Sequence, residues 1–246
     1  MRPPAPISTH RSDRLPMTSP VPESPSPEDA AAIEAASVIE AAAHADSGTR
    51  KRPKPGERRV QILEALATML EQPGAERITT AGLAARLDVS EAALYRHFAS
   101  KAQMFEGLIE FIEQSVFGLI NQLGEREPDA NARCRKLVTL LLQFGEKNPD
   151  MTRVMVGDAL VFENERLQQR MNLFFDKIES ALRQNLREAA VVAGVATPTV
   201  DAQADASVVT AFCVGRLQRF ARSGFKRSPG ENLEHSLALL LPVARL

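Results

Sequence analysis

The chain has 246 residues, 44% of them hydrophobic and 25% charged, and its formal net charge at neutral pH is −1. This composition is that of an ordinary globular protein with one or two domains, and the net charge excludes an overall basic field for nucleic acid. No run of 18 apolar residues or apolar signal-peptide core occurs, so we expect a cytoplasmic protein that does not span a membrane. Because Cys134 and Cys213 lack metal-type spacing, we expect buried, reduced thiols and no metal or cofactor.

The first fifty residues differ from the rest of the chain. Segment 1–27 is rich in Pro and Ser, and segment 27–45 is rich in Ala and Glu. The first cannot bury enough apolar surface to offset the entropy lost on ordering, and the second favours at most a transient helix. We therefore expect residues 1–50 to form a disordered extension.

A basic run, RKRPKPGERR, follows at residues 50–59. Residues 50–101 contain ten Lys and Arg and six acidic residues, so their net charge is +4 (10 − 6) although the whole chain carries −1. The run can act as an arm along DNA phosphates or in a minor groove, or only as a solvated charge run. Its position directly before the helices described next favours the arm.

Three short helices are predicted between residues 57 and 101. The first covers Glu57–Leu70 and should end at Pro73-Gly74. Two more flank a tight turn at Asp88-Val89, with Thr79 or Thr80 and then Ser90 as N-caps, and Ser100 opens the next helix. The apolar spacing places these residues inside: Val60, Ile62, Leu63, Leu66, Ala67, Leu70, Leu83, Ala84, Leu87, Ala93, Leu94 and Phe98.

Two helices of about two turns joined in this way form a helix-turn-helix, whose second helix enters the DNA major groove. Hydroxyl and basic groups suit phosphate oxygens, and small side chains allow close approach to base edges. The spacing alone leaves open a capped helical pair with a solvated polar face. The candidate DNA-binding residues are Arg52, Arg58, Thr79, Thr80, Ser90, Glu91, Ala92, Tyr95, Arg96, His97 and Lys101.

The rest of the chain also predicts helices only, which makes the fold class all-α. We expect them at about 100–123, 130–147, 151–156, 160–190, 204–224 and 233–244, with a loop at 191–204. The helix at 130–147 contains LVTLLLQF and should be central, because it is apolar nearly all round. No phosphate loop, dinucleotide fingerprint or nucleophile elbow occurs, so we do not expect an enzyme.

The helices at 160–190 and 204–224 have wide apolar faces that predict a dimer. One alternative is that the faces cover each other within a single chain. We prefer the dimer because one helix-turn-helix contacts few base pairs, and two-fold pairing suits a palindromic site. The residues that carry these faces are Phe174, Ile178, Leu182, Val209, Phe212, Cys213, Leu217 and Phe220, with Gly215 small enough for a close helix.

The segment ITTAGLAARLDVSEAALYRHFASKAQMFEGLIEF resembles the DNA-binding region of the TetR family of bacterial regulators. This resemblance implies three parts, namely the extension at 1–50, a helix-turn-helix domain at 51–100 and a helical dimerisation domain at 101–246. It also implies pairing through two helices near the C-terminus. A further resemblance, from about residue 57 to 241, is to nucleoid occlusion regulators within that family.

Members of this group bind palindromic chromosomal sites as homodimers, including dimers of dimers, and bind the C-terminal tail of the division protein FtsZ. The resemblance therefore implies a nucleoid-associated protein whose tail-binding residues are Phe111, Ile112, Leu140, Lys147 and Asn148. Leu119 and Gln143 depart from the Arg and Gly of better-known members, which should alter affinity for the peptide. The alternative function is a ligand-responsive TetR-family repressor, although the apolar core positions offer few polar groups to orient a ligand.

Overall fold

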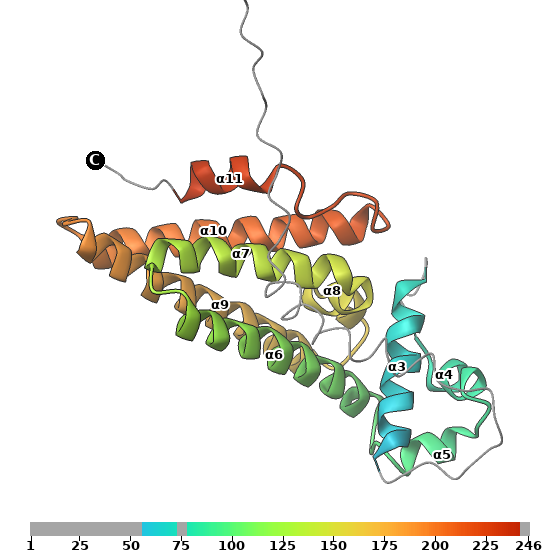
Figure 1. The fold of residues 1–246 in the computed structure, drawn as a ribbon. Coiled ribbons are helices and arrows are strands. Elements are labelled where there is room, and N and C mark those ends of the chain that lie inside the picture. Colours follow the sequence, from blue (N-terminus) through green and yellow to red (C-terminus); the bar gives the residue numbers. More distant parts are fainter. Residues whose placement is uncertain (1–55, 73–77, 242–246) are drawn as a thin grey trace, which may run out of the picture.

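A computed structural model of the chain describes residues 56–72 and 78–241, and every regular element within these ranges is a helix (Figure 1). The predicted all-α class is therefore confirmed. Arg52 and the predicted extension at 1–50 lie outside the described residues. The elements are α3 (Glu57–Glu71), α4 (Thr80–Arg86), α5 (Glu91–Tyr95), α6 (Lys101–Arg126), α7 (Ala130–Lys147), α8 (Pro149–Met155), the 3-10 helix η2 (Asp158–Leu160), α9 (Glu165–Val192), α10 (Pro198–Arg222) and α11 (Leu233–Leu240).

Helices α3, α4 and α5 form a small N-terminal unit, which we call the DNA head because it contains the helix-turn-helix predicted to bind DNA. Ile62, Leu66, Leu83 and Leu94 are each at most 1% exposed and make its core, as their spacing predicts. Val60 was wrongly assigned to this core, since its side chain is 48% exposed. Helix α3 stays amphipathic without it, because the stripe from Ile62 to Leu70 already faces α4 and α6.

Helix α6 connects the DNA head to the larger C-terminal domain. Ser100 caps it, because its Oγ accepts a hydrogen bond of 3.2 Å from the amide of Gln103, whose side chain accepts one of 2.8 Å from the amide of Ala99. The helix continues to Arg126, three residues past the predicted end. Its buried stripe contains Met104, Phe105, Leu108, Ile112 and Val116.

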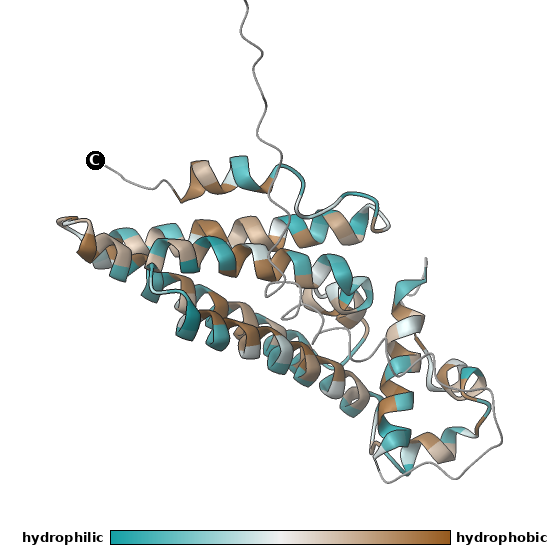
Figure 2. Ribbon diagram, viewed as in Figure 1, coloured by the Kyte–Doolittle hydropathy of each residue, from teal (hydrophilic) through white to brown (hydrophobic). Residues whose placement is uncertain are grey.

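Helix α7 is central in the C-terminal domain, as predicted, and packs against α6, α8, α9 and α10. A close approach between α7 and α10 depends on Gly145, where a Cβ would lie 2.4 Å from Cδ2 of Leu217. Figure 2 shows apolar and polar residues alternating along α6, α9 and α10, as expected of helices with one buried face.

Three predicted boundaries are wrong at the C-terminal helices. Helix α9 begins at Glu165, not 160, because Asn164 caps it and η2 precedes it. The predicted loop at 191–204 is helical at both ends, so that only residues 193–197 link α9 to α10. Pro198 occupies the first turn of α10, where its missing N–H costs nothing. Helix α8 begins at Pro149 for the same reason.

The apolar faces assigned to the dimer are covered within one chain. Leu182, Val209 and Leu217 are 0% exposed, and α9 packs along α10. The alternative of intrachain packing is therefore correct for these residues, which also include Phe174, Ile178 and Cys213. On the outer faces of the same helices, Leu173 is 57% exposed and Val208 is 56% exposed.

Candidate nucleic-acid interface and partner surface

The helix-turn-helix is built by local hydrogen bonds that the sequence signals. The Thr79 Oγ1 caps α4 by accepting from the Gly82 amide at 3.1 Å, and the Ser90 Oγ caps α5 by accepting from the Ala93 amide at 3.3 Å. Between them Asp88 adopts a left-handed backbone with φ of 52°. The amides of Asp88 and Val89 bond back to α4 at 3.2 and 3.0 Å, which is a Schellman ending.

Thr80 and Glu91 hold the two short helices together. The Thr80 Oγ1 donates to the Glu91 Oε2 at 2.5 Å, which connects the start of α4 to the start of α5. The carboxylate is therefore occupied inside the motif, where it satisfies a hydroxyl and lies at a helix N-terminus. This contact gives both residues a positioning role in the motif.

The outer face of α5 is open to solvent. Ala92, Tyr95 and Arg96 are exposed, with Tyr95 at 45%, and within the described ranges Arg96 forms no ion pair. Helix α5 thus presents a small residue, an aromatic hydroxyl and a free guanidinium on one side. This combination suits base edges and phosphates in a major groove.

Arg59 is a positioning residue that the sequence did not single out. Its guanidinium donates to the backbone carbonyl of His97 and lies 4.1 Å from the ring centroid of Phe98. It therefore fixes the end of the recognition segment to α3. Its neighbour Arg58 donates to the side chain of Gln61 at 2.9 Å, and the His97 side chain is half-buried.

Lys101 lies at the junction of the DNA head and the C-terminal domain. Its Nζ forms an ion pair with the nearly buried carboxylate of Glu163, in the segment between η2 and α9. The ammonium also lies 5.7 Å from the ring centroid of Phe105. The structure therefore gives this predicted phosphate ligand an internal partner in place of a free charge.

The residues predicted to bind a peptide tail lie on α6 and α7, which pack against each other. Phe111 and Leu140 are half-buried, and Lys147 is exposed without an ion pair in the described part of the chain. The Asn148 side chain donates to the Phe144 carbonyl at 2.7 Å, which closes the end of α7. Ile112 is 0% exposed and belongs to the core, so its predicted contact with a partner is wrong for this structure.

Two family models match most of the residues that the structure describes. Residues 62–108 match the bacterial regulatory proteins of the tetR family, and residues 128–243 match the tetracyclin repressor-like C-terminal domain. The nucleoid occlusion factor SlmA of Aliivibrio fischeri strain MJ11 is 51% identical over 193 residues, which cover 76% of this chain and 96% of that protein. The chain belongs to the TetR family, in its SlmA group.

Other relatives agree with this assignment. SlmA from Escherichia coli O9:H4 is 51% identical over 191 residues, covering 77% of this chain and 94% of that one. Among solved structures, the TetR-family regulator PfmR from Thermus thermophilus has 22% identity and a TM-score of 0.60, covering 81% of this chain and 100% of that one. The similarity to PfmR concerns the fold alone. As a TetR-family member, the chain is a DNA-binding regulator and not an enzyme.

Burial shifts the pKa of four described side chains, and one of them, Asp150, lies where the head meets the C-terminal domain. Burial, helped by the nearby charge of Glu71 on α3, raises the pKa of Asp150 on α8 to about 6. Burial likewise raises the pKa of Glu64 on α3. The thiols of Cys134 and Cys213 are free and buried, as predicted, and burial raises the pKa of each to about 12.

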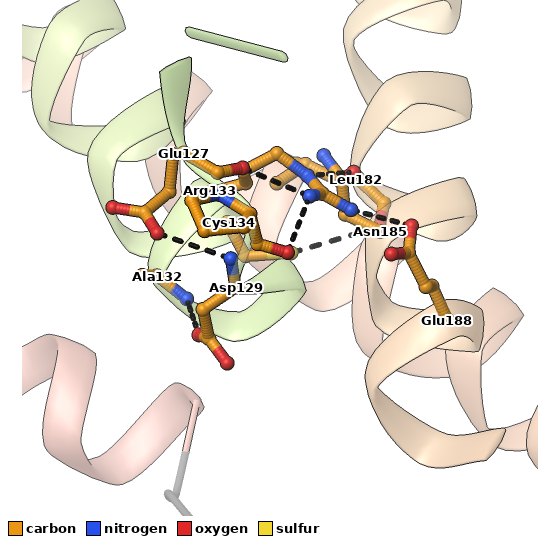
Figure 3. Close-up of polar contacts among 9 residues, drawn as sticks. Glu127, Asp129, Ala132, Arg133, Cys134, Leu182, Asn185 and Glu188 are labelled. Carbon is orange, nitrogen blue, oxygen red and sulfur yellow. Dashed lines mark hydrogen bonds and ion pairs between the residues drawn. The ribbon is translucent and has the colours of Figure 1, made fainter. Parts of the chain in front are cut away.

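Arg133 is a second long-range anchor that the sequence pattern missed. It donates to the carbonyls of Glu127 and Pro128, each at 2.9 Å, and to the Asn185 side chain at 3.0 Å, and it pairs with Glu188 (Figure 3). The turn between α6 and α7 is thereby fixed to α9. Neither Arg59 nor Arg133 carries a local signal for these long-range contacts, because the residues that they reach on other elements lie 38 to 55 residues away.

No helix in the described ranges is long and apolar enough to cross a membrane. The same residues contain no group of three or more His, Cys, Asp or Glu side chains that could hold a metal ion.

Proposed function

We propose that this protein is a nucleoid occlusion factor that binds palindromic chromosomal sites and, while bound, engages the C-terminal tail of FtsZ. Assembly of the division ring over unsegregated DNA would then be blocked, and the protein would be cytoplasmic and associated with the nucleoid. The observation that carries the proposal is the 51% identity to SlmA proteins over nearly their whole length.

DNA binding in this proposal rests on the exposed face of α5. Tyr95 and Arg96 contact the groove and its phosphates, and Thr79, Thr80, Ser90 and Glu91 hold the recognition segment in place. Two heads are needed for a palindrome, because each half-site takes one recognition helix. A homodimer through the outer faces of α9 and α10, with Leu173 and Val208 at the contact, provides them.

The FtsZ tail in this proposal lies on the α6–α7 surface. Phe111 and Leu140 offer partly exposed apolar contact, and Lys147 offers a positive charge that no described residue neutralises. A short peptide with apolar and acidic side chains matches that combination. Leu119 and Gln143, both half-buried on the same two helices, are positioned to change the affinity of this surface for the tail.

Fluorescence anisotropy of a labelled FtsZ C-terminal tail peptide, with and without a palindromic duplex, tests the proposal. We expect saturable binding that strengthens with the duplex. Lys147→Glu should weaken tail binding about tenfold without changing DNA affinity, because it reverses a charge on the tail surface only. Tyr95→Ala should abolish specific DNA binding and leave the dimer intact.

The matched control is Arg126→Glu, an exposed charge reversal in the last turn of α6, about four turns beyond Phe111, that should change neither affinity. If the wild-type protein binds DNA but does not bind the FtsZ tail peptide, the alternative function, a ligand-responsive repressor of the same family, is favoured. If Lys147→Glu leaves the affinity for the tail peptide unchanged, Lys147 is not part of the tail-binding surface.

A further inference from the structure

The end of α10 and the loop after it form a concentrated basic surface. Between Asp205 and Glu231 the chain has five basic residues and no acidic one, although its overall net charge is −1. Four of the five are exposed. These four together with Arg153 of α8 are called the basic corner, and they are Arg219, Arg222, Lys226 and Arg227.

The loop that carries Lys226 and Arg227 of the basic corner is tightly built. Helix α10 ends in a Schellman motif, with the Gly224 amide bonded to Ala221 at 3.1 Å and the Phe225 amide bonded to Phe220 at 3.0 Å. The rings of Phe220 and Phe225 lie 5.2 Å apart. Ser223 then accepts from the amides of Lys226 and Arg227 through its Oγ, at 3.1 and 2.9 Å. The basic side chains are therefore presented from a fixed backbone.

Phe225 has an uncommon backbone conformation for a bulky residue. Its φ is 63°, in the left-handed region that side chains with a Cβ rarely adopt. The ring that this conformation directs inward packs under the guanidinium of Arg153 at 5.3 Å. The left-handed turn thus joins the loop to α8 and sets Arg153 beside the charges of the loop.

The charges of the basic corner have no internal counterparts. Among the described residues Arg222, Lys226 and Arg227 form no ion pair, and the Nε of Arg153 is buried without a hydrogen-bond partner. By contrast Arg216, one turn earlier on α10, donates to a carbonyl at 2.8 Å and to a serine hydroxyl at 3.0 Å. A structural role that accounts for Arg216 therefore does not extend to the corner.

Two ordinary explanations cover only part of this surface. Basic residues in the last turn stabilise the negative end of a helix dipole, which explains Arg219 and Arg222. Lys226 and Arg227 lie beyond the helix and gain little from it. Acidic residues near the loop, Glu146 and Glu231, do not outnumber the five positive charges.

The position of the corner favours a protein partner over DNA. Helix α8 packs against both α3 and α10, so the corner lies at the end of the C-terminal domain nearest the head. Figure 1 shows α5, the recognition helix, at the far side of the head from α10. A duplex held by α5 therefore lies away from the corner.

We propose that the basic corner docks an acidic polypeptide segment, in addition to the DNA and tail surfaces described above. Arg guanidinium groups bind carboxylates through paired N–H donors, and the fixed loop limits the entropy lost on binding. The segment adds a contact on the face that remains accessible when the protein is on DNA.

A fluorescein-labelled peptide of about ten glutamates, at about 50 mM salt, is the probe for the full-length protein. We expect saturable binding that weakens at higher salt and is absent for a glutamine peptide of equal length. The double variant Lys226→Glu/Arg227→Glu should bind about tenfold more weakly. The matched control is Arg86→Glu/Arg96→Glu on the DNA head, which changes the charge equally and should retain peptide affinity.

A second measurement locates the peptide directly. Carbodiimide joins a glutamate carboxylate of the peptide to a lysine amine with loss of water, and mass spectrometry should find this amide at Lys226. Failure to find the cross-link, or equal losses in the two double variants, would overturn the proposal. The affinity for a duplex without palindromes is measured for both double variants. If only Lys226→Glu/Arg227→Glu lowers it, the basic corner is a nucleic-acid site and the proposal is wrong. Lys147 is unchanged throughout, so these outcomes are independent of FtsZ-tail binding.

Discussion

The helix-turn-helix of the DNA head (α4 and α5) and the α9–α10 hairpin are both helical pairs, but different interactions hold them together. Helices α4 and α5 have only 7 and 5 residues, too short to be stable alone, and they depend on the caps at Thr79 and Ser90 and the bond from Thr80 to Glu91. Helices α9 and α10 have 28 and 25 residues and are joined by a long apolar seam. Polar bonds close in sequence therefore fix α4 against α5, and nonlocal apolar packing fixes the hairpin.

Local bonds and nonlocal packing leave different traces in the sequence. In the helix-turn-helix, the sequence distinguishes residues that build the motif from residues that face outward, because each cap residue accepts a hydrogen bond from an amide three residues later. Along α9, the apolar spacing does not indicate whether the stripe packs against a helix of the same chain or against a second copy. Phe174 is 0% exposed within its own chain, whereas its neighbour Leu173 is 57% exposed.

The largest expected effect comes from opening the apolar seam. Phe174→Ala should lower the free energy of unfolding by about 3–5 kcal/mol, because the ring packs against Phe117 and Phe175 at 5.4 and 5.1 Å and leaves a cavity. Urea unfolding at fixed protein concentration measures it. The control is Leu173→Glu on the same helix, which should spare protomer packing and shift the dimer towards monomer in sedimentation. Equal effects of the two changes on unfolding would refute the assignment of buried and outer faces.

The α3–α8 contact between head and C-terminal domain belongs to neither type, since it buries an acid. The pKa of Asp150 rises from 3.8 to about 6 through burial, so the neutral carboxyl is the form that folding favours. A folded-state pKa above the unfolded value gives stability that is present below about pH 4 and is lost as the pH rises through about 6. Asp150→Asn should therefore stabilise the protein by about 2 kcal/mol at pH 8 and leave it nearly unchanged at pH 4.

Urea unfolding of both proteins at the two pH values checks this prediction. Glu71→Gln is a useful comparison, because it removes the nearby charge from α3 and should give a smaller gain in the same direction. A gain for Asp150→Asn that is as large at pH 4 as at pH 8 would show that titration of this group is not its cause.

The sequence predicted the head well because its determinants are local. The caps Thr79, Ser90 and Ser100 are all confirmed, and each bonds an amide three residues on. It predicted the C-terminal domain less well, because Gly194 and Pro198 resemble loop residues until one sees that they end one helix and begin the next.

Contacts between residues far apart in the sequence could not be predicted, because local spacing does not show which residues meet in the fold. The spacing of Ile112 fits a surface or a core position equally, and only α7 and its neighbours decide that it is buried. Lys101 has the charge of a phosphate ligand, yet Glu163, 62 residues later, holds it. Periodicity identifies which face is apolar or charged, whereas tertiary packing decides what meets that face.

The smallest effect should come from a single cap in the head. Ser90→Ala removes the acceptor of the Ala93 amide and should destabilise α5 by about 1 kcal/mol. Hydrogen exchange of the α5 amides should accelerate about fivefold, and DNA affinity should fall because the recognition helix frays. The control Ser207→Ala replaces an exposed serine inside α10, where alanine is the better helix former and no loss is expected. Since the hairpin does not depend on caps, exchange in α9 and α10 should be the same in both variants, and acceleration there would mean that the head and the seam unfold together.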